Sequence, residues 1–415
     1  MTAAVSPLCF EDVALLDVAA GERRPGSHVV VADGRIREIS ERAITNVPAG
    51  TLRIAGRGRT LMPGLIDAHM HATLTAMDLG ALARKPVMVL AQEARLVLER
   101  MLRRGFTSVR DAGGADHGLA AAVSRGLVDG PRLFFSGHAI SQTGGHGDFR
   151  AHDHDHTCAC SLHAEGFSVV ADGPEAVRRA AREELRRGAH QVKVMASGGV
   201  ASPSDPVWLV GFTPEELEAA VTEARRWRTY VLAHAYTPEA ITQAVRAGVR
   251  SVEHGNLIDE ATAALMAEHG AYLVPTLVTY SAISEMGAQL GFPARSLAKL
   301  ADVLDAGLGS LEIAGRAGVP IGFGTDLLGE THDMQSRELE IRAQVQSSAE
   351  ILRSATVVNA ALLQREGEVG IVEKGAVADL LLVDGDPLAD LSVLAGQGER
   401  IDLVVVDGAI RVGAP

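Results

Sequence analysis

The stretch Leu65-Ile66-Asp67-Ala68-His69-Met70-His71 decides how this sequence is interpreted. Successive side chains of a β-strand point to opposite faces, so two histidines spaced two apart point to the same face. Two imidazoles on one face are typical of a metal site. Asp67 would share that face, either as a hydrogen-bond partner of the ligands or as a purely structural residue.

Further residues suited to such a site each close a short apolar run later in the chain. They are Lys193, His234, His254 and Asp326. One histidine at the end of a strand is more often an ordinary polar residue than a ligand, but six candidates in order favour a shared site. Lysine is the unusual member of the set. Burial lowers the pKa of a lysine, and the neutral amine can react with carbon dioxide to give an anionic carbamate.

The middle of the chain alternates strand-like and helix-like segments, which predicts a parallel sheet. The strand-like runs are 65–71, 107–111, 132–136, 191–196, 230–234, 249–254, 271–275 and 321–326. The helix-like stretches include 92–104, 174–187, 214–228, 238–247 and 259–269. Eight strands are consistent with a (β/α)₈ TIM barrel, although periodicity alone also allows an open doubly wound sheet. The ligand positions favour the barrel, because closure brings the C-terminal ends of the first and last strands to one rim.

The two ends of the chain are rich in β signals. Residues 28–32 and 35–39 flank Asp33-Gly34, and residues 402–406 and 409–412 flank Asp407-Gly408. Both patterns predict hairpins. A further β run covers 378–386. Because a lone hairpin is marginal in water, we expect residues 1–62 and 367–415 to form one small β-sandwich beside a catalytic barrel at 63–366.

Composition and charge restrict the class of partner. The 39 basic and 52 acidic residues among 415 give a net charge of −13, which argues against nucleic acid and against an anionic membrane surface. The first residues carry no signal-peptide pattern, and no apolar stretch approaches the roughly 20 residues of a membrane span. The three cysteines, Cys9, Cys158 and Cys160, are not a disulfide framework. We therefore expect a cytoplasmic enzyme with a small-molecule substrate, and a homo-oligomer by default.

At this point the motifs resemble a known family. Residues 62–71 with the later lysine, histidines and aspartate resemble the amidohydrolase superfamily over nearly the whole chain. Within it, Gly144-Gly145-His146-Gly147, the run 193–200 and His234-Ala235-Tyr236 resemble the prolidase and metal-dependent carboxypeptidase branch, which includes amide hydrolases acting on ochratoxin. The superfamily also builds a small β domain from both termini.

The resemblance implies a binuclear centre for two divalent ions, with zinc expected. In this assignment His69, His71 and Asp326 hold one ion, His234 and His254 hold the other, and N-carboxylated Lys193 bridges both. A bridging water, deprotonated near neutral pH, is then the nucleophile. Asp326 would act as general base and then as general acid. His146 and Tyr236 would contact the developing oxyanion or the carboxylate of the substrate.

The function predicted in this way is hydrolysis of an amide bond in a dipeptide (Xaa-Pro or Xaa-Xaa) or an N-acyl amino acid such as ochratoxin. The alternatives are an aryl urea or carbamate hydrolase, a mononuclear deaminase or imidazolonepropionase-like ring hydrolase, and a catalytically inactive scaffold relative. Mononuclear relatives usually lack the bridging lysine and carry an acid where this chain has Ala235-Tyr236. The tract 152–163, rich in histidine and cysteine, is interpreted as a solvated lid or substrate loop with adventitious metal binding.

Overall fold

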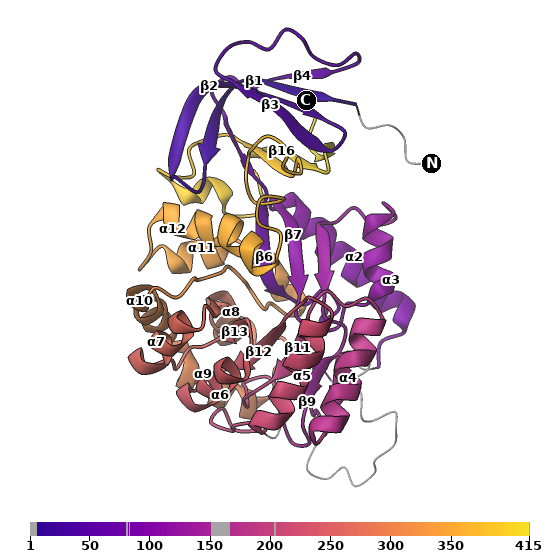
Figure 1. Ribbon diagram of the computed structural model, residues 1–415, viewed down its shortest axis with the longest axis vertical. Coiled ribbons are helices and arrows are strands. Elements are labelled where there is room, and N and C mark those ends of the chain that lie inside the picture. Colours follow the sequence, from indigo (N-terminus) through magenta and orange to yellow (C-terminus); the bar gives the residue numbers. More distant parts are fainter. Residues whose placement is uncertain (1–5, 80–81, 83, 151–166, 203–204, 415) are drawn as a thin grey trace.

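The computed structural model describes residues 6–79, 82, 84–150, 167–202 and 205–414. The tract 152–163, and with it the interpretation given to it, lies outside the described residues. Figure 1 shows a sheet built from the first and last parts of the chain at one end of the molecule, and strands surrounded by helices below it.

The sheet at one end joins strands from both ends of the sequence, in the order β17-β16-β15-β5-β1-β2-β3 with β4 paired to β1. Its strands are β1 (Leu8–Asp17), β2 (Glu22–Ala32), β3 (Arg35–Ser40), β4 (Leu52–Ala55), β5 (Thr60–Pro63), β15 (Leu380–Val383), β16 (Ile401–Val406) and β17 (Ala409–Val412). Both predicted hairpins are confirmed, since β2 pairs β3 and β16 pairs β17 antiparallel. The two stacked layers of a sandwich, and the domain boundaries at 62 and 366, stay predictions.

The hairpin turns have the geometry that their sequences favour. Asp33 and Gly34 have φ of 53° and 72°, and Asp407 and Gly408 have φ of 50° and 75°. Two successive residues with positive φ form the type I′ turn that matches the twist of paired strands. The two halves of the sheet join where β5 pairs antiparallel with β15.

The remaining strands run parallel in two ladders. One has the order β6-β7-β8 and the other β10-β9-β11-β12-β13-β14. Their bounds are β6 (Leu65–Met70), β7 (Phe106–Asp111), β8 (Arg132–Phe135), β9 (Ala139–Ser141), β10 (Ser168–Val170), β11 (Val192–Met195), β12 (Val231–Ala235), β13 (Ser251–His254) and β14 (Tyr272–Val274). The parallel sheet expected from the alternating pattern is therefore present.

The last expected strand, 321–326, is irregular. It makes one isolated parallel bridge, between Ile321 and Leu273. The backbone N–H of Ala68 nevertheless donates to the carbonyl of Phe323, and that of Thr325 donates to the carbonyl of His69. The segment packs closely against β14 and β6, because a Cβ on Gly324 would lie 2.5 Å from Val274 Cγ1 and 2.7 Å from His69 Cβ. Glycine allows this close approach at the cost of regular strand geometry.

Five predicted helices are confirmed within a few residues. They are α2 (Val87–Arg103), α4 (Pro174–Arg186), α5 (Pro214–Arg226), α6 (Pro238–Ala247) and α7 (Glu260–Glu268). Three begin with proline at the first turn, and Thr213, Thr237 and Asp259 cap backbone N–H groups at α5, α6 and α7. Helices that the sequence analysis did not name are α3 (His117–Ser124), α8 (Leu277–Met286), α9 (Ala294–Leu304), α10 (Gly307–Ala317), α11 (Arg337–Arg342), α12 (Ser348–Arg353) and α13 (Asn359–Leu362).

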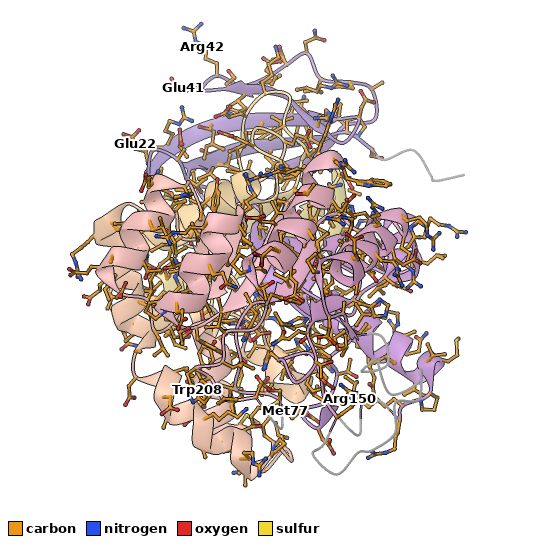
Figure 2. The ribbon with its side chains drawn as sticks, turned by 60° about the horizontal axis from the view of Figure 1, so that its bottom comes forward. Glu22, Glu41, Arg42, Met77, Arg150 and Trp208 are labelled. Atoms are coloured by element: carbon orange, nitrogen blue, oxygen red, sulfur yellow. The ribbon has the colours of Figure 1, made fainter. Side chains whose placement is uncertain are left out.

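Loops that follow the parallel strands gather at one end of the molecule. Figure 2 shows Met77, Arg150 and Trp208 at the end away from Glu41 and Arg42, which belong to the terminal sheet and the residues next to it. Met77 follows β6 and Trp208 follows β11. Among the described residues, the helices are all too short or too polar to cross a bilayer.

Candidate metal centre

The residues predicted for the site come together in one cavity. It is lined by all eight of them, namely His69, His71, His146, Lys193, His234, Tyr236, His254 and Asp326. Oδ1 of Asp326 lies 3.0 Å from Nε2 of His71 and 3.4 Å from Nε2 of His69. The ring of His254 lies 4.9 Å from that of His69 and 4.6 Å from that of His234, between centroids. Ligand atoms of His69, His71 and Asp326 all lie within 4.8 Å of one another.

Each of the four predicted histidine ligands has one ring nitrogen engaged by a buried partner. These contacts are His69 Nδ1 to Glu253 Oε2 at 2.7 Å, His71 Nδ1 to the carbonyl of Gly113 at 2.8 Å, His254 Nδ1 to Thr276 Oγ1 at 2.8 Å and His234 Nε2 to the carbonyl of Gly198 at 3.2 Å. A second partner of this kind fixes the tautomer and the orientation of a metal-binding imidazole. The other nitrogens of His69 and His71 lie next to Asp326, their predicted co-ligand.

Lys193 lines the same cavity and is 1% exposed. Its burial lowers the pKa to about 8, although the carboxylates of Glu253 and Asp326 oppose that change. A buried lysine with a lowered pKa holds a neutral, nucleophilic amine in a useful fraction of molecules near neutral pH. The side chain can therefore undergo the carboxylation that the sequence predicts.

The backbone is strained at three residues of the site. His254, Thr276 and Asp326 have φ of 76°, 49° and 51°. Residues other than glycine adopt this left-handed region at a cost of about 1–3 kcal/mol each, and they keep it only where surrounding contacts determine it. Two of the three are predicted metal ligands, and Thr276 supports one of them. Strain therefore coincides with the chemistry.

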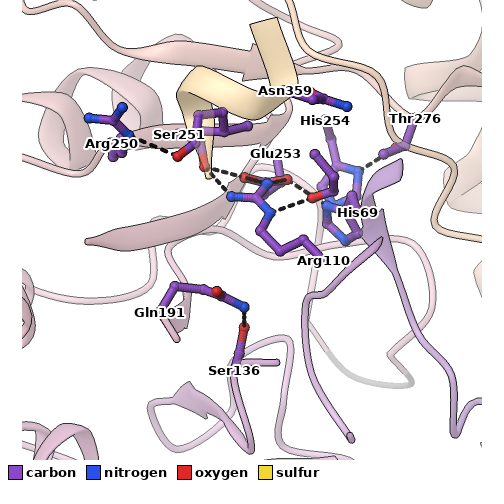
Figure 3. A network of polar contacts seen from close by, with 12 residues as sticks. His69, Arg110, Ser136, Gln191, Arg250, Ser251, Glu253, His254, Thr276 and Asn359 are labelled. Atoms are coloured by element: carbon purple, nitrogen blue, oxygen red, sulfur yellow. Dashed lines mark hydrogen bonds and ion pairs between the residues drawn. The ribbon is translucent and has the colours of Figure 1, made fainter. Parts of the chain in front are cut away.

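Behind His69 lies a charged network that the sequence analysis missed (Figure 3). Nη2 of Arg110 donates to both carboxylate oxygens of Glu253, at 2.8 and 2.9 Å, and Nη1 donates to Ser251 Oγ at 3.0 Å. Burial by itself would raise the pKa of Glu253, but Arg110 and His69 hold that pKa well below its usual range. Glu253 is thus a buried anion that orients a ligand. The sequence contains one sign of this network, because Arg110 and Glu253 are charged residues within the otherwise largely uncharged strands β7 and β13.

Asp67 bonds to the backbone and to residues next to the predicted ligands. Its carboxylate accepts hydrogen bonds from the backbone N–H of His69 at 3.1 Å, from Thr325 Oγ1 at 2.6 Å and from Gln335 Nε2 at 2.8 Å. It therefore ties the end of β6 to the segment that carries Asp326. Of the two roles considered for Asp67, the structure favours support of the ligand backbone.

His146 and Tyr236 line the cavity next to His234. The His146 ring stacks on His234 with centroids 4.3 Å apart and 15° between planes. Its Nδ1 lies 3.0 Å from Ser202 Oγ and 3.2 Å from Asp205 Oδ2. Tyr236 accepts a hydrogen bond of 3.0 Å from the hydroxyl of Tyr280. The sequence analysis named neither Asp205 nor Tyr280, because each lies in a loop or helix outside the recognised motifs.

The loop beneath His146 is held by a lysine. Nζ of Lys299 donates to three backbone carbonyls of this loop, those of Gly199, Ser202 and Asp205, at 2.9, 2.9 and 2.6 Å. The backbone N–H of Gly199 in turn donates to Asp205 Oδ2 at 2.7 Å. His146 therefore rests on a loop whose conformation depends on a cation from α9.

Known proteins resemble this chain over most of its length. A family model described as the amidohydrolase family matches residues 60–411. Ochratoxinase from Aspergillus niger is 33% identical over 398 residues, which cover 91% of this chain and 82% of that protein. The crystal structure of a prolidase complexed with N-methylphosphonate-L-proline has 48% identity and a TM-score of 0.95, and covers 98% of this chain and 99% of its own.

A crystal structure of a Xaa-Pro dipeptidase with bound methionine in the active site has 30% identity and a TM-score of 0.86, and covers 98% of this chain and 99% of its own. These matches extend over both the terminal sheet and the parallel strands. Together with the family model, they show that the chain belongs to the amidohydrolase family.

Proposed function

We propose that this protein is a binuclear metal-dependent hydrolase that cleaves an amide bond in a small substrate bearing a carboxylate, either an Xaa-Pro or related dipeptide or an N-acyl amino acid. One observation carries the proposal. Four buried histidines, Lys193 and Asp326 line one cavity, and each histidine has one ring nitrogen engaged by a group outside the predicted ligand set. Membership of the amidohydrolase family and similarity to ochratoxinase and prolidase support the bond type.

The side chains in the cavity fit two divalent ions. His69, His71 and Asp326 would hold one ion, and His234 and His254 the other, with zinc the ion that imidazole and carboxylate ligands suit. The carbamate of Lys193 would bridge them. Two such ions would supply a deprotonated water near neutral pH and polarise the scissile carbonyl.

The other groups have roles that follow from their contacts. Asp326 lies beside the histidines and can take a proton from water and pass it to the leaving nitrogen. Because Tyr280 donates to the oxygen of Tyr236, the hydrogen of Tyr236 stays available for the developing oxyanion. Asp205 contacts Nδ1 of His146, so Nε2 is the nitrogen left for substrate, and it donates to the oxyanion or to the substrate carboxylate when the ring carries both protons.

We also infer that the parallel strands close into an eight-stranded barrel. The segment around 321–325 bonds to β14 on one side, through Leu273 and Gly322, and to β6 on the other. Between β8 and β11, the backbone N–H of His190 donates to the carbonyl of Phe135 at 2.9 Å. A closed ring explains how His69 and Asp326, from the first and last segments, reach one centre.

The proposal is tested by metal analysis combined with a hydrolysis screen. We expect about two ions per chain, hydrolysis of at least one Xaa-Pro dipeptide or N-acyl amino acid, and loss of activity on chelation that Zn²⁺ reverses. One ion per chain with release of ammonia from a ring substrate would instead indicate a deaminase. A protein that binds no metal and hydrolyses nothing would be a scaffold relative. Full activity after verified metal removal would contradict the mechanism.

A further inference from the structure

A second hollow lies between α2 and α3, beside the metal cavity. Its volume is about 610 Å³, within the 300–1,000 Å³ range typical of ligand sites. Its walls are largely aliphatic and include Leu82, Leu90, Ala94, Leu119, Ala122 and Leu127. We call this hollow the aliphatic groove. The metal cavity itself holds only about 50 Å³, so a substrate with any sizeable acyl group must extend beyond it.

The aliphatic groove is continuous with the metal cavity. Leu74, Leu79, Phe149 and Phe167 line both. The ring of Phe167 contacts the ring of the predicted ligand His71, with centroids 5.3 Å apart. The ring of Phe149 contacts the ring of Phe167 in turn, with centroids 5.9 Å apart. An aromatic wall therefore runs from a metal ligand to the groove. The polar groups of His146 and Tyr236 contact a different predicted ligand, His234.

The groove leaves apolar groups in contact with water. Helix α3 has the apolar sequence HGLAAAVS, yet none of its residues is fully buried. Val87 at the start of α2 is 75% exposed and Leu127 after α3 is 66% exposed, and both line the groove. A cluster of exposed apolar side chains rimmed by polar residues is typical of a binding site. Polar groups at the rim, such as Arg95 and Asp116, make contacts of their own with Glu99 and with the backbone of Leu119.

We propose that the aliphatic groove binds the acyl part of the substrate, and that the enzyme prefers amides with a long aliphatic or an aryl acyl group. This inference rests on the proposed amide hydrolysis. The substrate would lie with its carboxylate toward His146 and Tyr236, its amide at the metal centre, and its acyl chain past Phe167 into the groove. The continuity of the two cavities and the aliphatic lining favour this occupant over a second copy of the chain.

The test is a series of N-acyl-L-prolines from acetyl to decanoyl. For wild-type enzyme, kcat/KM should rise by about fourfold for each methylene that becomes buried, until the groove is filled. Ala122→Trp fills the groove with an indole, and Leu127→Glu places a charge at its mouth. Either change should flatten the dependence on chain length while N-acetyl-L-proline is hydrolysed within about twofold of wild type.

A matched control is Leu96→Glu. Leu96 lies on α2, is 40% exposed and does not line the groove, so the same substitution there should leave the whole series unchanged. Circular dichroism and thermal unfolding check that the variants fold. If Ala122→Trp does not fold, Leu127→Glu still tests the groove, because the side chain of Leu127 is already mostly exposed.

Several outcomes would overturn the inference while leaving amide hydrolysis intact. One is a wild-type kcat/KM that does not depend on acyl chain length, and another is a dependence that is unchanged in both groove variants. A third is a change in oligomeric mass in Leu127→Glu with an unchanged dependence, which would mean that the groove is an interface between copies. If no N-acylproline is hydrolysed, the proposed function is decided by the wider screen of Xaa-Pro dipeptides and N-acyl amino acids, and calorimetry decides the groove separately. Tighter binding of N-decanoyl-L-proline than of N-acetyl-L-proline, lost in Ala122→Trp, supports the inference, and equal binding overturns it.

Discussion

Two buried histidine–carboxylate pairs belong to this cavity, and they are built differently. His69 contacts Glu253 at 2.7 Å, and the guanidinium of Arg110 on β7 donates to both oxygens of Glu253 on β13. His146 contacts Asp205 at 3.2 Å, and Asp205 lies in a loop where Ser202 and the N–H of Gly199 donate to it. The first pair is fixed by regular strands and a buried cation. The second depends on loop conformation.

This difference indicates a division of labour. A ligand that must hold an ion in one geometry is served by a rigid strand and a charged partner. A residue that contacts variable substrates is served by a loop, where changes are tolerated without damage to the core. Changes on the strand side should therefore alter metal content and stability, and changes on the loop side should alter kinetics alone.

The largest effect is expected for Lys193→Ala on the strand side. Without the bridging carbamate, metal and activity should be lost together, with kcat/KM falling by roughly 1,000-fold or more. Short carboxylic acids should partly restore both by supplying the missing bridge. Metal analysis and kinetics with and without added formate or acetate measure this. An unsupplemented variant with full activity and full metal content would remove the binuclear interpretation.

A matched pair of substitutions compares the two carboxylates directly. Glu253→Gln leaves the buried Arg110 without its counter-charge, so the free energy of unfolding should fall by about 3 kcal/mol or more, with weaker metal binding. Asp205→Asn should retain the ions and most of the stability, and lower kcat/KM by about tenfold through His146. Urea unfolding, metal titration and kinetics provide the readouts. Equal losses of stability in both variants would abolish the distinction drawn between strand and loop.

The loop side itself is tested by His146→Ala and Tyr236→Phe. Both variants should keep the ions, and if the residue donates only in the transition state, kcat should fall by about a hundredfold with KM nearly unchanged. A rise confined to KM would instead assign ground-state binding of the substrate carboxylate. Loss of metal in either variant would show that the residue helps to hold the ions. Wild-type kinetics in both variants would contradict the proposed contact of these residues with substrate.

The smallest effect is a dependence of metal reconstitution on pH. The pKa of Lys193 is lowered to about 8 by burial, so the neutral amine increases up to that pH and then levels off. At fixed dissolved carbon dioxide, the rate at which the metal-free protein regains metal should rise about fivefold from pH 7 to 8 and less than about twofold from pH 8 to 9. A rise that continues at tenfold per unit to pH 10 would indicate an ordinary lysine.

The same lowered pKa has a consequence for stability. Between about pH 8 and the ordinary value near 10.5, the unfolded chain holds a proton on Lys193 that the folded chain has released. Stability rises with pH wherever the unfolded state binds more protons. The metal-free protein should therefore become more stable as the pH rises through this range, which urea unfolding at several pH values would measure.

The sequence predicted the ligands better than their partners, for a physical reason. Each ligand closes an apolar strand, and strand ends in a parallel arrangement meet at one rim, so residue type and position together identify them. Glu253 and Asp205 become partners only through contacts with residues far along the chain, and no local pattern specifies such contacts. The segment at 321–326, predicted as a strand, bonds to β14 and β6 but is irregular, because close packing at Gly324 affects its backbone in a way that local propensity does not reveal.

The fold shows a similar division. Helices α5, α6 and α7 begin at side-chain caps and α4 begins at a proline, and the predicted bounds of all four lie within about two residues of the observed ones. Helices α8, α9 and α10 follow one another after β14, without an intervening strand, and interrupt the alternating pattern used for the prediction. The terminal hairpins were predictable from Asp-Gly turns, whereas the pairing of β5 with β15 joins segments from opposite ends of the chain.

That pairing sets an order of events on the ribosome. Strand β5 at Thr60–Pro63 cannot meet β15 at Leu380–Val383 until the whole intervening chain has been synthesised, which takes roughly 15–60 s at 5–20 residues per second. During this interval the edge of β5 is unpaired and open to other chains. Slower synthesis therefore lengthens the time in which this edge of β5 can pair with another chain instead of with β15.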